Sequence, residues 1–149
     1  MLGVHEIDSS NLPLPTRFAV LGRMKKNTDR VGNASEAAIL AALVKRGKDV
    51  LVPFGQGLPY DLVLDEEGQF QRIQVKTGVL KDGFIAFNNV SNYRNYKGLI
   101  EFFGIYCPQN GKTYLISVAE VGYNVSCLRL SPTKNGQKKG VHFAEEFEI

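Results

Sequence analysis

The sequence predicts an α/β (α+β) fold in which a mixed central β-sheet is flanked by helices. Three observations lead to this prediction. One amphipathic helix precedes a series of short strands, two of these strands flank an acidic, glycine-containing turn, and a later pair flanks Asn110-Gly111. At 149 residues the chain is long enough for one domain with a real core and too short for two of ordinary size, so we expect a single domain over residues 1–149.

The composition is that of an ordinary globular protein. Hydrophobic residues make up 44% of the sequence and charged residues 22%, and no repeat or low-complexity tract is apparent. The apolar runs are far shorter than a bilayer requires, and the first residues do not resemble a signal peptide. We therefore expect a cytoplasmic protein without a membrane partner. Cys107 and Cys127 stand in apolar runs without metal-site spacing, which predicts buried free thiols.

The first element that the sequence predicts clearly is a helix from Ala34 to Arg46, with Asn33 as its N-cap and Gly47 at its end. Residues 1–30 show little periodicity and are expected to form an N-terminal arm or extension. Within the helix, Glu36 lies on or beside the stripe that would face a sheet. Two explanations fit an acid there: a capping box, in which its carboxylate accepts from the Asn33 amide, or a functional carboxylate.

Short strands follow the helix. They are expected over residues 49–53, 58–64, 69–77, 84–88, 100–107, 113–118 and 125–130. In the first hairpin, residues 66–69 are expected to form a four-residue loop that pairs Asp65 with Phe70. The same register places Asp61 opposite Gln74. Because side chains alternate along a strand, Gln74 and Lys76 share a face, and with Asp61 they would form one polar cluster. The reverse face is apolar enough to pack against a helix and carries Leu62, Leu64, Ile73 and Val75.

Basic residues are unevenly distributed, although the net charge is only +3. One group lies near the N-terminus and another near the C-terminus, and between residues 89 and 97 amides alternate with aromatic and basic side chains. Each group is either solvated surface or a set of contacts to phosphates, sugars and base edges. The candidates for DNA contact are Arg23, Lys25, Lys26, Tyr93, Arg94, Tyr96, Lys97, Lys134, Lys138 and Lys139.

The first hairpin carries Pro59-Tyr60-Asp61 at the start of one strand and Gln74-Val75-Lys76 on the next. An acid after a proline, followed by an acidic or amide residue two places before a lysine, resembles the PD-(D/E)XK nuclease superfamily. The sequence departs from the common pattern by one extra residue before Asp61 and by Gln74 in place of Asp or Glu. Its Q-x-K form is similar to the branch that includes a small group I intron homing endonuclease from cyanobacteria. Later segments, at residues 96–98, 103–108 and 134–140, also resemble that branch.

The resemblance implies a restriction-endonuclease-like core and a divalent-metal-dependent DNA endonuclease, of the site-specific homing type. A Holliday-junction resolvase or repair nuclease of the same fold is the alternative, and a catalytically inactive DNA-binding module is the alternative from another class. The implied catalytic residues are Glu36, Asp61, Gln74 and Lys76. The implied partner is double-stranded DNA, bound by a homodimer or homotetramer, because one such site cuts one strand.

The expected cofactor is Mg²⁺, or Mn²⁺ in its place. A hard dication prefers oxygen ligands and keeps several waters, and the implied ligands are Glu36, Asp61, the Gln74 side-chain oxygen and the Val75 carbonyl. The metal would polarise the scissile phosphate and lower the pKa of a bound water. Lys76 would orient that water and counter the charge that develops on the phosphate.

Overall fold

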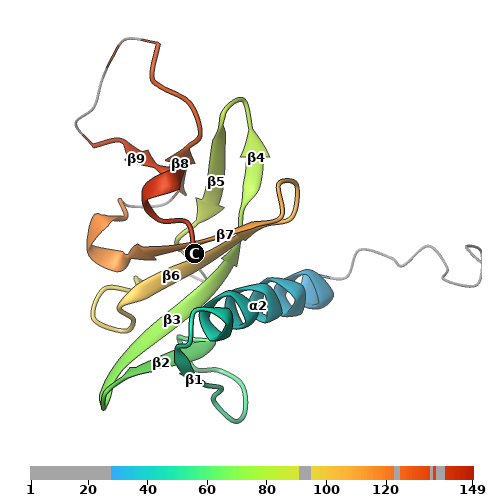
Figure 1. Cartoon of the computed structure of the whole chain (residues 1–149), viewed down its shortest axis with the longest axis vertical. Coiled ribbons are helices and arrows are strands. Elements are labelled where there is room, and N and C mark those ends of the chain that lie inside the picture. Colours follow the sequence, from blue (N-terminus) through green and yellow to red (C-terminus); the bar gives the residue numbers. More distant parts are fainter. Residues whose placement is uncertain (1–27, 91–94, 123–124, 135, 137–139) are drawn as a thin grey trace, which may run out of the picture.

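The computed structural model describes residues 28–90, 95–122, 125–134, 136 and 140–149 (Figure 1). Its elements are α2 (Thr28–Lys45), β1 (Asp49–Leu51), β2 (Leu62–Glu66), β3 (Gln69–Thr77), β4 (Val79–Lys81), β5 (Phe84–Asn88), β6 (Phe102–Cys107), β7 (Lys112–Ser117), η2 (Val118–Glu120), β8 (Val125–Arg129), β9 (His142–Phe143) and η3 (Ala144–Glu146). Within these ranges, one α-helix and two β-sheets confirm the predicted α+β class. Among the helices of these ranges, none is long and apolar enough to cross a membrane.

The central sheet has five strands in the order β1-β2-β3-β6-β7. Strands β3 and β6 run parallel, whereas the other neighbours are antiparallel, so the sheet is mixed as predicted. Helix α2 lies across one face of this sheet (Figure 1). There it buries Ile39 and Leu43 against the side chains of Leu62, Leu64, Ile73 and Val75. The apolar face that the sequence predicts is therefore the face that packs against the helix.

A second sheet covers part of the other face. Its four strands have the order β4-β5-β8-β9, and its buried side chains, such as Ile85 and Leu128, form one cluster with Phe103 and Ile105 of β6. In the described part of the chain this layer is made of strands. Burial on both faces explains why β6 is almost continuously apolar. Strands β4 and β9, with three and two residues, were not predicted.

The start of α2 differs from the prediction. The helix covers Thr28–Lys45, and Asn33 lies inside it, so Asn33 is not the N-cap and a capping box with Glu36 is excluded. Tertiary packing can override local capping signals of this kind. Near Asn33 the helix is tied to the sheet: the Ser35 hydroxyl donates to the Val31 carbonyl (3.1 Å) and is hydrogen-bonded to Thr77 Oγ1 of β3 (2.7 Å).

Residues with positive φ set two of the turns. Gly47 (φ 72°) ends α2 as predicted, and the Lys48 amide donates to the Leu43 carbonyl (3.1 Å) in a Schellman motif. Between β2 and β3 the turn consists of Glu67 (φ 53°) and Gly68 (φ 85°), which is the type I′ arrangement. The loop therefore has two residues and not the predicted four, because residues 66 and 69 pair with each other. The predicted register, with Asp65 opposite Phe70, is confirmed.

The two cysteines differ in burial. Cys107 is buried between the sheets, as predicted, and both thiols are free. Cys127 is exposed, so the prediction of a second buried thiol was wrong. Side chains alternate along β8, and Leu128 takes the position that faces the core.

Gly78, between β3 and β4, allows close packing at the junction of the two sheets. A Cβ atom there would lie 2.6 Å from Ile85 Cγ2 and 3.0 Å from Ile105 Cγ2, and both isoleucines are buried. We expect Gly78→Ala to lower the free energy of unfolding by about 1–3 kcal/mol, measured by chemical denaturation, because the added methyl group would overpack the core. The control is Gly32→Ala in α2, where the added methyl meets nothing within 4 Å; it should stabilise by about 0.5–1 kcal/mol. Equal stability of Gly78→Ala and the wild type would contradict this packing.

Candidate active site

Asp61 stands immediately before β2 and is fixed by three hydrogen bonds to β3. Its backbone amide donates to the Ile73 carbonyl (2.9 Å). Its Oδ2 atom accepts from the Val75 backbone amide (2.7 Å) and from Gln74 Nε2. The predicted position of Asp61 opposite Gln74 is therefore observed. Because two of the three bonds use backbone groups of β3, the pairing of the strands itself orients the carboxylate.

Gln74 and Lys76 lie on the same face of β3, as the alternation of side chains predicts. The Gln74 Nε2 atom donates to Asp61 Oδ2 and also to the Val75 carbonyl (3.2 Å). The carboxylate and the carbonyl thus converge on one polar group. Lys76 follows along the strand, and its Nζ atom donates to the Tyr96 hydroxyl (3.2 Å). Asp61, Gln74 and Lys76 form the polar cluster that the sequence predicts.

Glu36 comes to this cluster from α2, and its carboxyl group interacts electrostatically with Asp61. Burial raises the pKa of Glu36, and the negative charge of Asp61 raises it further. Burial also raises the pKa of Asp61, against the opposing effects of the Val75 amide, the Lys76 charge and the Gln74 amide. Two carboxylates are thus held where their ionised forms are disfavoured. A bound cation would relieve both the desolvation and the repulsion.

The donor set fits a hard dication. In the ranges that the structure describes, no three His, Cys, Asp or Glu side chains gather as a ready metal site, so a metal here would rest on two carboxylates, an amide and a backbone carbonyl. These are oxygen donors, which suit Mg²⁺ with its retained waters. Gln74 presents Nε2 to the oxygens of Asp61 and Val75. Rotation of the amide by half a turn would present Oε1 instead.

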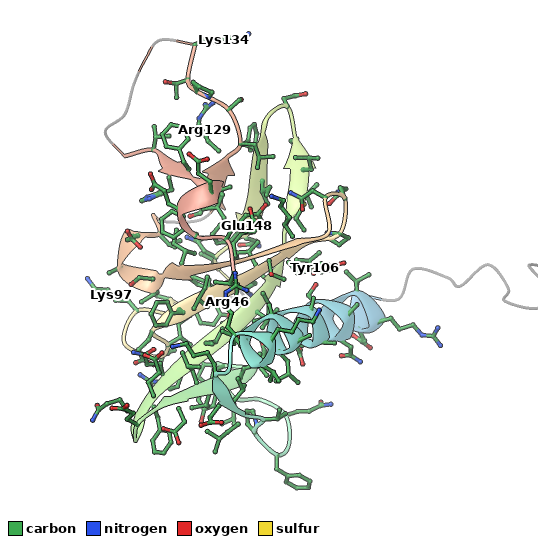
Figure 2. All side chains as sticks on the ribbon, in the orientation of Figure 1. Arg46, Lys97, Tyr106, Arg129, Lys134 and Glu148 are labelled. Carbon is green, nitrogen blue, oxygen red and sulfur yellow. The ribbon has the colours of Figure 1, made fainter. Side chains whose placement is uncertain are left out.

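The candidates for DNA contact differ in their burial, and only some of them lie in the described residues. Lys97 and Lys134 are exposed and lie on separate parts of the molecule (Figure 2). Tyr96 is only 5% exposed and its ring belongs to the core, so its expected place on a surface segment is wrong. Its contact with Lys76 was not predicted, because no local pattern links residues on separate segments. The other candidates lie outside the described residues: Arg23, Lys25, Lys26, Tyr93, Arg94, Lys138 and Lys139.

The raised pKa of Glu36 leads to a stability prediction for the metal-free protein. A raised pKa means that the folded state disfavours the ionised form of Glu36. The protonated form carries no such penalty, so the free energy of unfolding falls as pH rises through the folded-state pKa. Glu36→Gln should therefore raise the free energy of unfolding near pH 7, by a few tenths of a kcal/mol because the side chain is partly exposed.

Thermal unfolding in a chelator, compared at about pH 7 and about pH 4, measures the effect. The gain should shrink toward the lower pH, where the wild-type carboxyl is protonated. Glu145→Gln, on the exposed surface of η3, is the control and should show no such gain. A Glu36→Gln variant that is less stable than the wild type at neutral pH would contradict the disfavoured carboxylate.

Comparison with known proteins agrees with this geometry. Residues 26–149 match the family described as PD-(D/E)XK endonuclease, and no curated protein matches the chain. A solved structure of a bacterial homing endonuclease, I-Ssp6803I, has a similar fold, with a TM-score of 0.66 and 22% sequence identity over 83% of this chain and 88% of that chain. The matched residues include α2, the hairpin of β2 and β3, and both sheets. The chain therefore belongs to the PD-(D/E)XK endonuclease family.

Proposed function

We propose that the protein is a divalent-metal-dependent endonuclease that hydrolyses phosphodiester bonds at specific sites in double-stranded DNA, in the manner of a homing endonuclease. The observation that carries this proposal is the convergence of Asp61 Oδ2 and the Val75 carbonyl on one amide, with Glu36 and Lys76 beside them. Membership of an endonuclease family supports the reaction, and the fold shared with a bacterial homing endonuclease supports the role.

Each residue of the cluster has a proposed part in the reaction. Mg²⁺ or Mn²⁺ would be held by Glu36, Asp61, the Gln74 amide oxygen and the Val75 carbonyl. A bound metal would polarise the scissile phosphate and lower the pKa of a bound water. Lys76 orients the attacking water and balances the negative charge that grows on the phosphate. The charge of Lys76 lowers the pKa of Asp61, so the two side chains interact electrostatically. The proposed role of Lys76 is that of a cation and not of a neutral base.

The remaining features of the proposal concern the whole protein. We propose one nuclease domain over residues 1–149, acting in the cytoplasm as a homodimer or homotetramer. The basic candidates near both ends and in residues 93–97 would contact the phosphates. A junction-resolving or repair nuclease is distinguished by comparing cleavage of linear duplex with that of a four-way junction. An inactive DNA-binding module is distinguished by a lack of metal-dependent nicking of any plasmid.

Asp61→Asn and Lys76→Ala should each lower the cleavage rate by orders of magnitude while the dissociation constant for DNA changes little. The cluster acts on the transition state, whereas phosphate contacts elsewhere supply most of the affinity. Single-turnover cleavage of a supercoiled plasmid and a binding titration in Ca²⁺ measure the two quantities. Asp49→Asn and Lys81→Ala, which change exposed residues on β1 and β4, are matched controls and should cleave as the wild type does. Normal cleavage by either site variant would refute the assignment.

Gln74→Glu tests whether the amide oxygen is a metal ligand. The substitution keeps the shape of the side chain and adds a negative charge, so half-maximal cleavage should need less Mg²⁺, by a factor on the order of five after the added repulsion from Asp61 and Glu36. Gln74→Ala should need more. The measurement is the cleavage rate as a function of Mg²⁺ concentration. If Gln74→Glu folds and binds DNA but is inactive at every Mg²⁺ concentration, the amide acts as a hydrogen-bond donor and not as a ligand.

A further inference from the structure

Tyr96 makes two contacts with Lys76. The Lys76 ammonium donates to the Tyr96 hydroxyl (3.2 Å), and the same Nζ atom lies 5.0 Å from the centroid of the ring. A cation at that distance from an aromatic face is attracted by the ring quadrupole. The contacts join a side chain on β3 to a residue on the separate segment that leads into β6. Lys76 is thus held at its tip as well as at its backbone.

The Tyr96 ring is itself fixed in place by the core. It meets Phe103 edge to face, with ring centroids 5.4 Å apart and an interplanar angle of 83°, and Phe103 packs in turn on Phe87 of the second sheet (6.0 Å). Phe103 lies on β6 directly beside Gln74 in the parallel register. The Tyr96 carbonyl accepts from the Leu99 and Ile100 amides (2.9 and 3.2 Å), which fixes the backbone as well. These contacts give the hydroxyl a defined position above β3.

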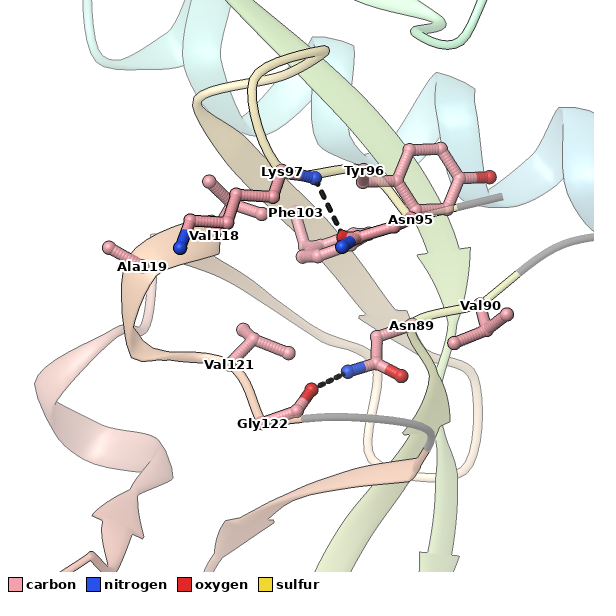
Figure 3. A pocket seen from close by; sticks show the side chains of 10 residues that line it. All are labelled: Asn89, Val90, Asn95, Tyr96, Lys97, Phe103, Val118, Ala119, Val121 and Gly122. Atoms are coloured by element: carbon pink, nitrogen blue, oxygen red, sulfur yellow. Dashed lines mark hydrogen bonds between the residues drawn. The ribbon is translucent and has the colours of Figure 1, made fainter. Parts of the chain in front are cut away.

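A cavity of about 720 Å³ lies next to Tyr96, and its lining includes Asn89, Asn95, Val118 and Val121 (Figure 3). In the close view the Tyr96 ring projects to one side of this space, with its hydroxyl at the outer end. The ring thus packs in the core against Phe103, and its hydroxyl is bonded to Lys76.

We propose that Tyr96 is a positioning residue for Lys76 in the cleavage reaction, an inference that rests on the proposed function. The hydroxyl accepts one of the three ammonium protons and leaves two for the attacking water and the phosphate. The ring face attracts the ammonium group without neutralising its charge, whereas a carboxylate in the same place would neutralise it. A tyrosine that only filled the core would need neither its hydroxyl nor an aromatic face toward Lys76, so the two roles differ in their consequences.

The test compares Tyr96→Phe and Tyr96→Leu in single-turnover cleavage at saturating DNA and Mg²⁺. Tyr96→Phe keeps the ring and loses the hydroxyl, and its rate should fall by about tenfold, the lower range for a lost hydrogen bond to a charged group. Tyr96→Leu loses both contacts and should fall further. The dissociation constant for DNA should not change. Tyr114→Phe is the matched control, since Tyr114 is also a buried tyrosine with a bonded hydroxyl, at Asn110 (3.0 Å), and should cleave normally.

A double-mutant cycle separates positioning from a structural role. If Tyr96 acts through Lys76, Tyr96→Phe should have no further effect on the residual rate of Lys76→Ala. An equal loss in both backgrounds would overturn the proposal, as would a wild-type rate for Tyr96→Phe. A wild-type rate for Tyr96→Phe leaves the proposed function intact as long as the wild type cleaves and Lys76→Ala does not. A wild type that cleaves no DNA with Mg²⁺ or Mn²⁺ would instead refute the proposed function, and the positioning role with it.

Discussion

The register between β2 and β3 is the constraint on which the candidate site depends. Side chains alternate along a strand, so a slip by one residue would turn Gln74 and Lys76 toward α2 and bring Ile73 and Val75 to the other face. Two features oppose such a slip. The two-residue type I′ turn fixes the pairing at one end, and the hydrogen bonds of Asp61 to the Ile73 carbonyl and the Val75 amide fix it at the other.

Burial on two sides makes β3 serve packing and chemistry together. One face supplies Ile73 and Val75 to the cluster under α2, and this apolar burial is the main source of stability for the strand. The other face is only partly covered by the second sheet, which leaves the polar cluster half-buried. Partial burial raises the pKa values of Glu36 and Asp61. The fold therefore keeps two carboxyl groups in a place that does not favour their charge, which is a common property of functional sites.

The sequence predicted the features of this fold that arise from local patterns. The alternation along residues 69–77, with an acidic turn before them, was enough to predict the register and the cluster of Asp61 with Gln74 and Lys76. The first turns of α2 were missed because they include Gly32 and Asn33, which have weak helix propensity, and local propensity does not show how a helix packs on a sheet. Strands β4 and β9 are too short to show a period. The contact of Tyr96 with Lys76 depends on how two separate segments pack, and the sequence carries no local signal for it.

An amide at position 74 has a physical advantage in the site that we propose. Without a metal, Gln74 Nε2 donates to both the Asp61 carboxylate and the Val75 carbonyl and so separates two acceptors that lie close together. A carboxylate in its place would add a third negative charge beside Glu36 and Asp61, whose ionised forms are already disfavoured. When a dication binds, the same amide can turn and offer its oxygen. Because one side chain can donate in the first state and accept in the second, the hairpin keeps its hydrogen bonds without a metal and still supplies a ligand when one is present.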